Sequence, residues 1–224
     1  MEQFPIVDIS YAVQNNNKDV VLNNDPEMNK VCQEVKDGFA EWGFIYVKGH
    51  GISQELIDTM FGQSKEFFQQ PVEKKNEILM DTSDTNYIIG YVPYKMETFK
   101  TDKPYDLKEA LDYTVNIKPE MKEKFPAQLL STYQQFFKEC KKLFLTLLKI
   151  LEKALAIEEP GLFASGHEKV GDLGNTTMLR SLYYPAINDA EILPEQLRCG
   201  EHSDYGSLTF LFQNADGLEV SSLE

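Results

Sequence analysis

The chain has 224 residues, 42% of them hydrophobic and 26% charged, a composition that is typical of a globular protein and argues against a largely disordered one. Its formal net charge of -14 produces a negative field that repels phosphate backbones and anionic lipid surfaces. We therefore expect no nucleic-acid partner and no membrane partner, although a local arginine or metal can still attract an anionic small molecule.

No segment has the pattern of a targeting or membrane-spanning sequence. The first ten residues, MEQFPIVDIS, contain no basic stretch followed by an apolar run, and no later run reaches the roughly 18 apolar residues of a membrane span. The three cysteines, Cys32, Cys140 and Cys199, are widely spaced and odd in number, which favours reduced thiols over a disulfide framework or a zinc site. These features predict a cytoplasmic protein.

The first half of the chain predicts short strands that alternate with amphipathic helices. Asp25 can cap a helix that has Pro26 in its first turn, and Gly43 closes this helix. Runs of β-branched and aromatic residues predict the strands. The expected elements are strands at 4–9, 44–47, 87–92 and 110–115 and helices from Pro26 to Gly43 and from Ser53 to Pro71.

The longest expected helix runs from Pro126 to Ala156. It carries a broad apolar stripe over about eight turns, which favours a scaffold helix packed on a sheet over a membrane or partner-binding helix. A loop is expected at 157–175, and the pattern after it is β. The predicted strands are 176–184, 199–205, 207–213 and 218–221. The fold class is therefore α+β.

His202 and Asp204 are the most informative pair for chemistry. On a strand, side chains two residues apart project to the same face, so the imidazole and the carboxylate can converge on one cation. Such a pair, with coordination positions left open, suits iron(II) that must also bind oxygen and a cosubstrate. A zinc hydrolase is disfavoured, because the nearby base Glu201 would point to the opposite face of the strand.

Several blocks of sequence occur in a characteristic order. They are FPIVD at 4–8, WGFIYVKGHGI at 42–52, LRSLYYP at 179–185, EHSDYGSLTFLFQ at 201–213 and GLEV at 217–220. Together they resemble the iron/ascorbate-dependent oxidoreductases, the 2-oxoglutarate-dependent dioxygenase family that includes isopenicillin N synthase. The resemblance implies a double-stranded β-helix, or jelly roll, after an N-terminal α/β region. It also implies Fe(2+) and 2-oxoglutarate as cofactors, with ascorbate as a further candidate.

The resemblance implies that His202 and Asp204 are the first two iron ligands and that Tyr184 contacts 2-oxoglutarate. Family members often have Asn where this chain has Leu182, which weakens the expected polar contact with the cosubstrate. Arg180 can contact an anionic substrate through its planar fork of donors, and a salt-bridged structural arginine is the alternative. No catalytic residue beyond the metal ligands is predicted. The implied reaction couples decarboxylation of 2-oxoglutarate to hydroxylation, desaturation or ring closure of a small-molecule substrate.

The C-terminal part departs from the family pattern. The family takes a second His ligand and an Arg-x-Ser pair from later strands, but none of the 20 residues after Asp204 is His or Arg. His50, in a turn, and His167, in a polar loop, are not persuasive replacements. We therefore expect a jelly roll that is incomplete at its C-terminus. Such a truncated chain would be inactive alone, and its unfinished sheet would favour self-association or pairing with a partner.

Three parts are expected along the chain. They are the N-terminal region of the dioxygenase family at 4–118, the scaffold helix at 119–156 and the first part of the jelly roll at 176–224. The predicted function is a non-haem iron(II), 2-oxoglutarate-dependent oxidoreductase. The alternative is a non-enzymatic binding or regulatory protein whose sheet a partner strand completes. Four aromatic residues between 81 and 108 either form part of a substrate-pocket wall or pack in the core: Tyr87, Tyr91, Tyr94 and Phe99.

Overall fold

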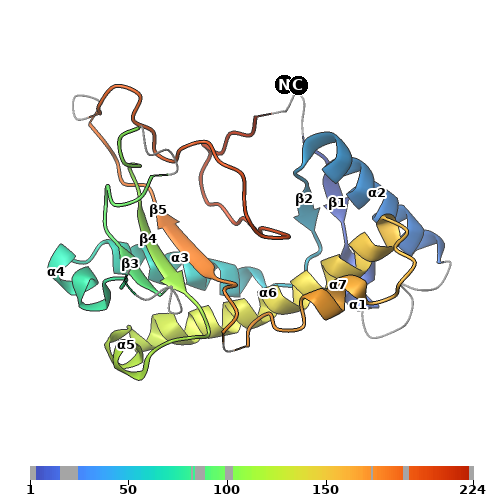
Figure 1. The fold of residues 1–224 in the computed structure, drawn as a ribbon, viewed down its shortest axis with the longest axis horizontal. Coiled ribbons are helices and arrows are strands. Elements are labelled where there is room, and N and C mark those ends of the chain that lie inside the picture. Colours follow the sequence, from blue (N-terminus) through green and yellow to red (C-terminus); the bar gives the residue numbers. More distant parts are fainter. Residues whose placement is uncertain are drawn as a thin grey trace. The chain divides into compact units, whose positions relative to one another are not determined.

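A computed structural model describes residues 4–15, 25–81, 83, 89–98, 103–172, 174–188 and 192–221 (Figure 1). The chain divides into two compact units. The first comprises Met1–Ser53, Lys138–Glu168 and Phe210–Glu224, and the second comprises Gln54–Phe137 and Lys169–Thr209. Within the described residues, no helix is both long enough and apolar enough to cross a membrane. The three-part division at 4–118, 119–156 and 176–224 remains a prediction.

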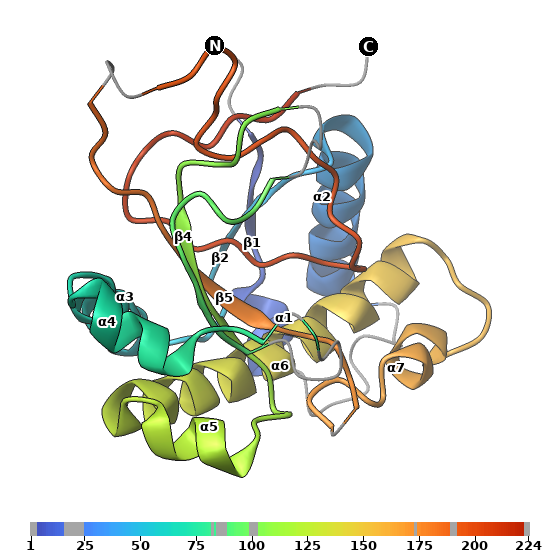
Figure 2. The same cartoon turned by 60° about the vertical axis from the view of Figure 1, so that its left-hand side comes forward.

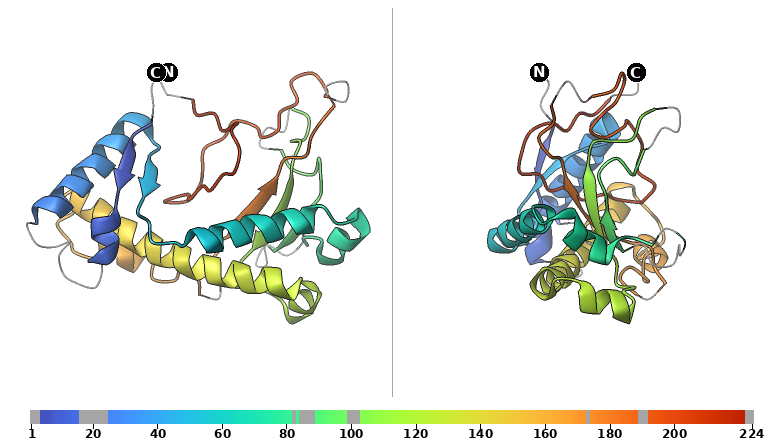
Figure 3. Two further views of the ribbon diagram at one scale, coloured as in Figure 1. Left: turned by 180° about the vertical axis from the view of Figure 1, so that it is seen from behind. Right: turned by 90° about the vertical axis from the view of Figure 1, so that its left-hand side faces the viewer.

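The first unit contains a pair of parallel strands with a helix beside them. Figure 3 shows β1 and β2 next to each other with α2 alongside, and the register pairs Val7 with Val47. Its elements are β1 (Ile6–Asp8), α1 (Ser10–Gln14), α2 (Pro26–Trp42), β2 (Tyr46–Lys48), the C-terminal part of α6 (Ala127–Ala154) and α7 (Leu162–Gly166).

Both ends of α2 lie where the sequence predicts them. The carboxylate of Asp25 accepts a hydrogen bond from the Met28 amide at 3.0 Å, which satisfies one of the free donors of the first turn. Gly43 ends the helix at a φ of 67°, a left-handed conformation that glycine adopts without strain. The buried face of this amphipathic helix carries Met28, Val31, Cys32 and Val35.

The second unit is built around a three-stranded antiparallel sheet in the order β3-β4-β5 (Figure 2). Its elements are α3 (Gln54–Phe68), α4 (Val72–Lys75), the 3-10 helix η2 (Asn76–Ile78), β3 (Gly90–Val92), β4 (Glu109–Tyr113), α5 (Pro119–Lys124), the N-terminal part of α6 and β5 (Leu179–Tyr183).

One face of this sheet packs on α3 and on the first part of α6. The hydroxyl of Ser181 in β5 lies 3.0 Å from that of Ser64 in α3, and it accepts a hydrogen bond from Tyr133 of α6 at 2.6 Å. The rings of Phe68 and Tyr183 stack with their centroids 5.2 Å apart. The apolar stripe of the long helix therefore covers a sheet, as the sequence predicts for a scaffold helix.

The C-terminal strands are the main error of the sequence-based prediction. Residues 192–221 contain neither a helix nor a strand, so the strands expected at 199–205, 207–213 and 218–221 are absent (Figure 2). A strand needs a neighbour to satisfy its backbone N–H and C=O groups, and an alternating apolar pattern cannot supply that neighbour. The described fold is thus mixed α+β with few strands, consistent with an incomplete jelly roll.

Smaller differences concern short elements and the aromatic residues. The sequence pattern does not predict α1, α5 or α7, because each of these helices has only one or two turns. Of the aromatic residues between 81 and 108, Tyr91 is 1% exposed and belongs to the core, whereas Tyr87 and Phe99 lie outside the described residues.

We predict that Gly90→Ala destabilises the protein by about 1 to 3 kcal/mol, the cost of a strained backbone conformation. Gly90 has a φ of 126°, and a Cβ there would lie 2.5 Å from the carbonyl oxygen of Ile78. Gly62 in α3 is the matched control, because a Cβ there meets nothing within 4 Å. Gly62→Ala should stabilise the helix by about 0.5 to 1 kcal/mol. Urea unfolding measures the free energy of unfolding of each variant. Equal effects of the two substitutions would contradict the prediction.

Candidate metal and cosubstrate site

His202 and Asp204 lie close together although the segment that carries them is not a strand. The Nε2 atom of His202 is 3.5 Å from Oδ1 of Asp204, and the two side chains are 33% and 48% exposed. Two donors that each lie about 2.1 Å from one ion are roughly 3 to 4 Å apart. The chemistry and spacing of this donor pair therefore fit a shared cation.

A backbone hydrogen bond sets the orientation of the His202 ring. Its Nδ1 lies 2.8 Å from the carbonyl oxygen of Gly200, and since that oxygen can only accept, Nδ1 carries the proton. In the neutral ring this leaves Nε2 as the nitrogen with the lone pair. Metal-bound histidines commonly have this arrangement, in which the second nitrogen donates to a carbonyl or carboxylate.

Tyr184 follows β5 and contacts the segment that precedes His202. The guanidinium carbon of Arg198 lies 5.6 Å from the Tyr184 ring centroid, and Arg198 Nη2 donates to the carbonyl oxygen of Pro185 at 2.7 Å. Burial, together with the nearby Cys199 and Asp106, raises the pKa of the Tyr184 hydroxyl. The hydroxyl therefore stays protonated and can donate a hydrogen bond to a carboxylate.

Arg180 is held between two carboxylates. Its Nε and Nη2 donate to Asp112 at 2.7 and 2.6 Å, while Nη1 and Nη2 donate to Glu97 at 3.1 and 3.0 Å. Burial alone would lower the pKa of Arg180, but the hydrogen bond and charge of Asp112 and the charge of Glu97 raise it. This is the geometry of a salt-bridged structural arginine, and contact with an anionic substrate stays a prediction.

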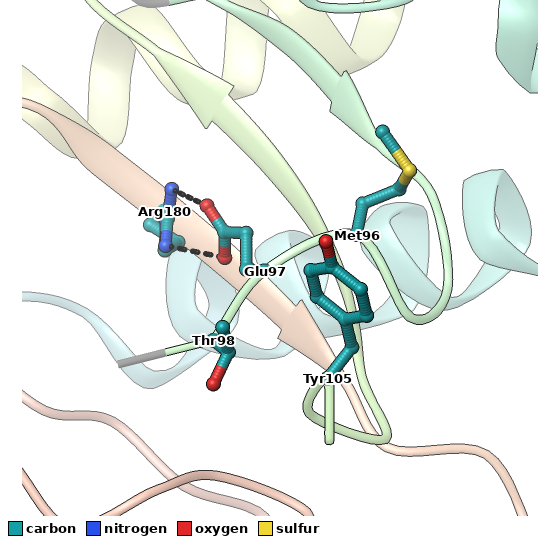
Figure 4. Close-up of a pocket in the computed structure, with 5 residues that line it drawn as sticks. All are labelled: Met96, Glu97, Thr98, Tyr105 and Arg180. Carbon is teal, nitrogen blue, oxygen red and sulfur yellow. Dashed lines mark hydrogen bonds and ion pairs between the residues drawn. The ribbon is translucent and has the colours of Figure 1, made fainter. Parts of the chain in front are cut away.

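Arg180 also lines a pocket of about 290 Å³ (Figure 4). The close-up shows its fork facing Glu97 while Tyr105 and Met96 lie along the neighbouring loop. Because the pocket is lined by an ion pair, a phenol, a hydroxyl and a thioether, it combines polar and apolar surfaces. Its lining residues are Met96, Glu97, Thr98, Tyr105 and Arg180.

The two other histidines have local contacts in the first unit. Nδ1 of His50 accepts a hydrogen bond from the Ile52 amide at 3.1 Å, and Nδ1 of His167 lies 2.7 Å from the Phe163 carbonyl oxygen. In the part of the chain that the structure describes, no group of three or more His, Cys, Asp or Glu residues is arranged to hold a metal. His202 and Asp204 therefore stay the two predicted ligands, and neither His50 nor His167 joins them in a metal-binding cluster.

Comparison with known proteins identifies the family of this chain. The family model described as non-haem dioxygenase in morphine synthesis N-terminal matches residues 4–141. This chain belongs to the 2-oxoglutarate/Fe(II)-dependent dioxygenase family. It is 33% identical over 195 residues to the UPF0676 protein C1494.01 of Schizosaccharomyces pombe. It is 32% identical over 235 residues to a homoarginine-6-hydroxylase of Oryza sativa subsp. japonica.

The fold agrees with that of a solved family member. The full-length Neurospora crassa protein crystallised with alpha-KG matches 91% of this chain with a TM-score of 0.68 and 28% identity, and it has also been crystallised with alpha-KG and thymine. The alignments cover 85% of this chain for the S. pombe relative and 96% for the rice relative. The chain spans only part of each of these longer proteins: 58% of the S. pombe relative, 68% of the rice relative and 62% of the N. crassa chain.

The residues that contact the candidate site from other segments were not predicted from the sequence. Asp106 and Lys108, 2% and 4% exposed, contact the segment before His202, and Glu97 binds Arg180. One signal was available. Charged residues stand at 106, 108 and 109, just before the strand predicted at 110–115, and at 112 within it, and charges that become buried require partners of opposite charge.

We predict that Arg180→Met lowers the free energy of unfolding by about 3 to 5 kcal/mol, because it leaves the fully buried carboxylate of Asp112 without its partner. The double variant Arg180→Met with Asp112→Leu should recover most of this loss, since it removes the buried carboxylate together with its half-buried partner. Urea unfolding of the three proteins tests this. A loss below about 1 kcal/mol in the single variant would show that the ion pair is dispensable.

Proposed function

We propose that this chain carries the iron and cosubstrate residues of a non-haem iron(II), 2-oxoglutarate-dependent oxygenase that acts on a small organic molecule. The supporting observation is the 3.5 Å approach of His202 Nε2 to Asp204 Oδ1, with the opposite ring nitrogen bonded to Gly200. An imidazole and a carboxylate with open positions suit iron(II). When bound, iron and 2-oxoglutarate supply oxygen activation coupled to decarboxylation.

The chain's own residues would have three roles in this function. His202 and Asp204 would hold the metal, and the Tyr184 hydroxyl would donate a hydrogen bond to a carboxylate oxygen of 2-oxoglutarate. The pocket beside Arg180 and Glu97 is our candidate for part of the substrate region, because it offers both polar and apolar contacts. Use of ascorbate and a cytoplasmic location remain predictions from the sequence.

A second candidate function rests on the edge of the sheet. β5 pairs with β4 on one side, and among the described residues no strand pairs with its other side. An unpaired edge can accept a strand from a second copy or from another protein. In this reading the chain is a binding or regulatory protein. A chain that associates in solution but does not bind iron would favour it over the oxygenase.

We predict that anaerobic titration with Fe(II) in the presence of 2-oxoglutarate gives the visible charge-transfer absorption of a chelated ferrous complex. His202→Ala should weaken iron binding by more than the roughly 10- to 100-fold that is typical of a change outside the ligand set. His167→Gln is the control, because it also removes an imidazole but lies outside the proposed site. Unchanged iron affinity in His202→Ala would contradict the proposed ligand.

For Tyr184→Phe we expect the Kd for 2-oxoglutarate to rise about 10-fold, since a hydrogen bond to a charged group contributes about 1.5 to 3 kcal/mol, at least part of which a water can replace. Iron affinity should stay within about twofold. The iron-loaded chain titrated with 2-oxoglutarate provides the measurement. An unchanged Kd would contradict the proposed contact of Tyr184 with 2-oxoglutarate.

A further inference from the structure

A buried carboxylate just before β4 is bonded to the segment that carries the proposed iron ligand. Asp106 is 2% exposed, and each of its oxygens accepts one hydrogen bond. Oδ1 accepts from the Gly200 amide at 3.1 Å, and Oδ2 accepts from Nζ of Lys108 at 2.8 Å. A buried carboxylate requires a partner, and the ammonium group of Lys108 is that partner for Asp106.

The hydrogen bonds continue from Gly200 to the imidazole. The Gly200 residue donates through its amide to Asp106 and accepts through its carbonyl from Nδ1 of His202 at 2.8 Å. Every partner in this series has one possible role, since a lysine ammonium and an amide only donate and a carboxylate and a carbonyl only accept. Consecutive hydrogen bonds thus join Asp106 to Gly200 and Gly200 to the ring of His202.

Further contacts align the same two segments. The Leu107 amide donates to the carbonyl oxygen of Leu197 at 3.0 Å, and Nε2 of Gln196 donates to the carbonyl oxygen of Tyr105 at 2.8 Å. Residues 196–200 are therefore bonded at several points to residues 105–108. Because β4 follows directly, a segment without regular secondary structure acquires a defined position from the sheet.

We propose that Asp106, charge-balanced by Lys108, is a positioning residue for His202. It holds Gly200 so that the Gly200 carbonyl accepts the Nδ1 proton and the Nε2 lone pair is presented to the metal. This inference rests on the proposed role of His202 as an iron ligand. Groups that orient a metal-bound histidine through its second nitrogen are known to set metal affinity.

The test compares Asp106→Ala and Asp106→Asn with Glu109→Gln. Glu109 is the matched control, because it is also a buried carboxylate paired with a buried lysine, Lys75, but it binds the Tyr91 hydroxyl instead of the segment at 196–202. Anaerobic Fe(II) titration of the full chain should show an affinity about 10- to 100-fold lower in Asp106→Ala. The loss should be smaller in Asp106→Asn, whose amide oxygen can still accept from Gly200, and absent in Glu109→Gln.

A second measurement reports on the ring itself without metal. In ¹⁵N-histidine spectra at about pH 8.5, where imidazole is neutral, the His202 signals of the wild type should be those of the Nδ1–H tautomer. Asp106→Ala should shift them toward a mixture of tautomers, and Glu109→Gln should not. The His202→Ala spectrum assigns the signals, and thermal unfolding of each variant identifies the proteins that are folded.

The outcomes separate the two proposals. If Asp106→Ala leaves both the tautomer and the iron affinity unchanged while His202→Ala abolishes iron binding, the positioning role is overturned and the proposed function stands. If Asp106→Ala changes the tautomer but even the wild type does not bind iron, the positioning of His202 stands and the proposed function fails. Equal losses in Asp106→Ala and Glu109→Gln would overturn the positioning role, because the effect would then come from general destabilisation.

Discussion

The burial of β4 is the constraint on which the second unit depends. All five residues of this strand are buried, yet it carries two carboxylates, and a third lies just before it at Asp106. Each carboxylate binds a cation from a different place: Glu109 binds Lys75 at the end of α4, Asp112 binds Arg180 in β5, and Asp106 binds Lys108. Because an unpaired buried charge is costly, these pairs fix which segments can surround the strand.

These contacts explain how His202 and Asp204 can have defined positions although they do not lie on a strand. The expected same-face geometry of His202 and Asp204 relied on alternation along an extended segment. In the structure the two side chains approach each other in an irregular segment whose preceding residues are bonded to those before β4. The orientation of the His202 ring comes from the Gly200 carbonyl, not from strand geometry. The residues that support the site are thus distant from it in sequence.

The two faces of the β3-β4-β5 sheet have different contacts. The face with Ser181 is covered by α3 and by the first part of α6, where a hydroxyl from each helix meets the serine. The opposite face carries Arg180 and Asp112 and borders the pocket with Glu97. Apolar packing stabilises the first face, while the charged groups of the second face are paired with one another.

The sequence by itself determined the elements with strong local signals and the identity of the family. Helix α2 begins at Asp25 and ends at Gly43 because a capping carboxylate and a left-handed glycine act within a few residues. The sequence blocks around His202 indicated the family directly, because a motif depends on residue order alone. Only the tertiary structure decided that residues 192–221 form no strand, that Asp106 and Lys108 contact the segment before His202, and that Glu97 binds Arg180. Strand pairing and buried ion pairs join residues far apart in the chain, and a local pattern contains no information on which distant group will be the neighbour.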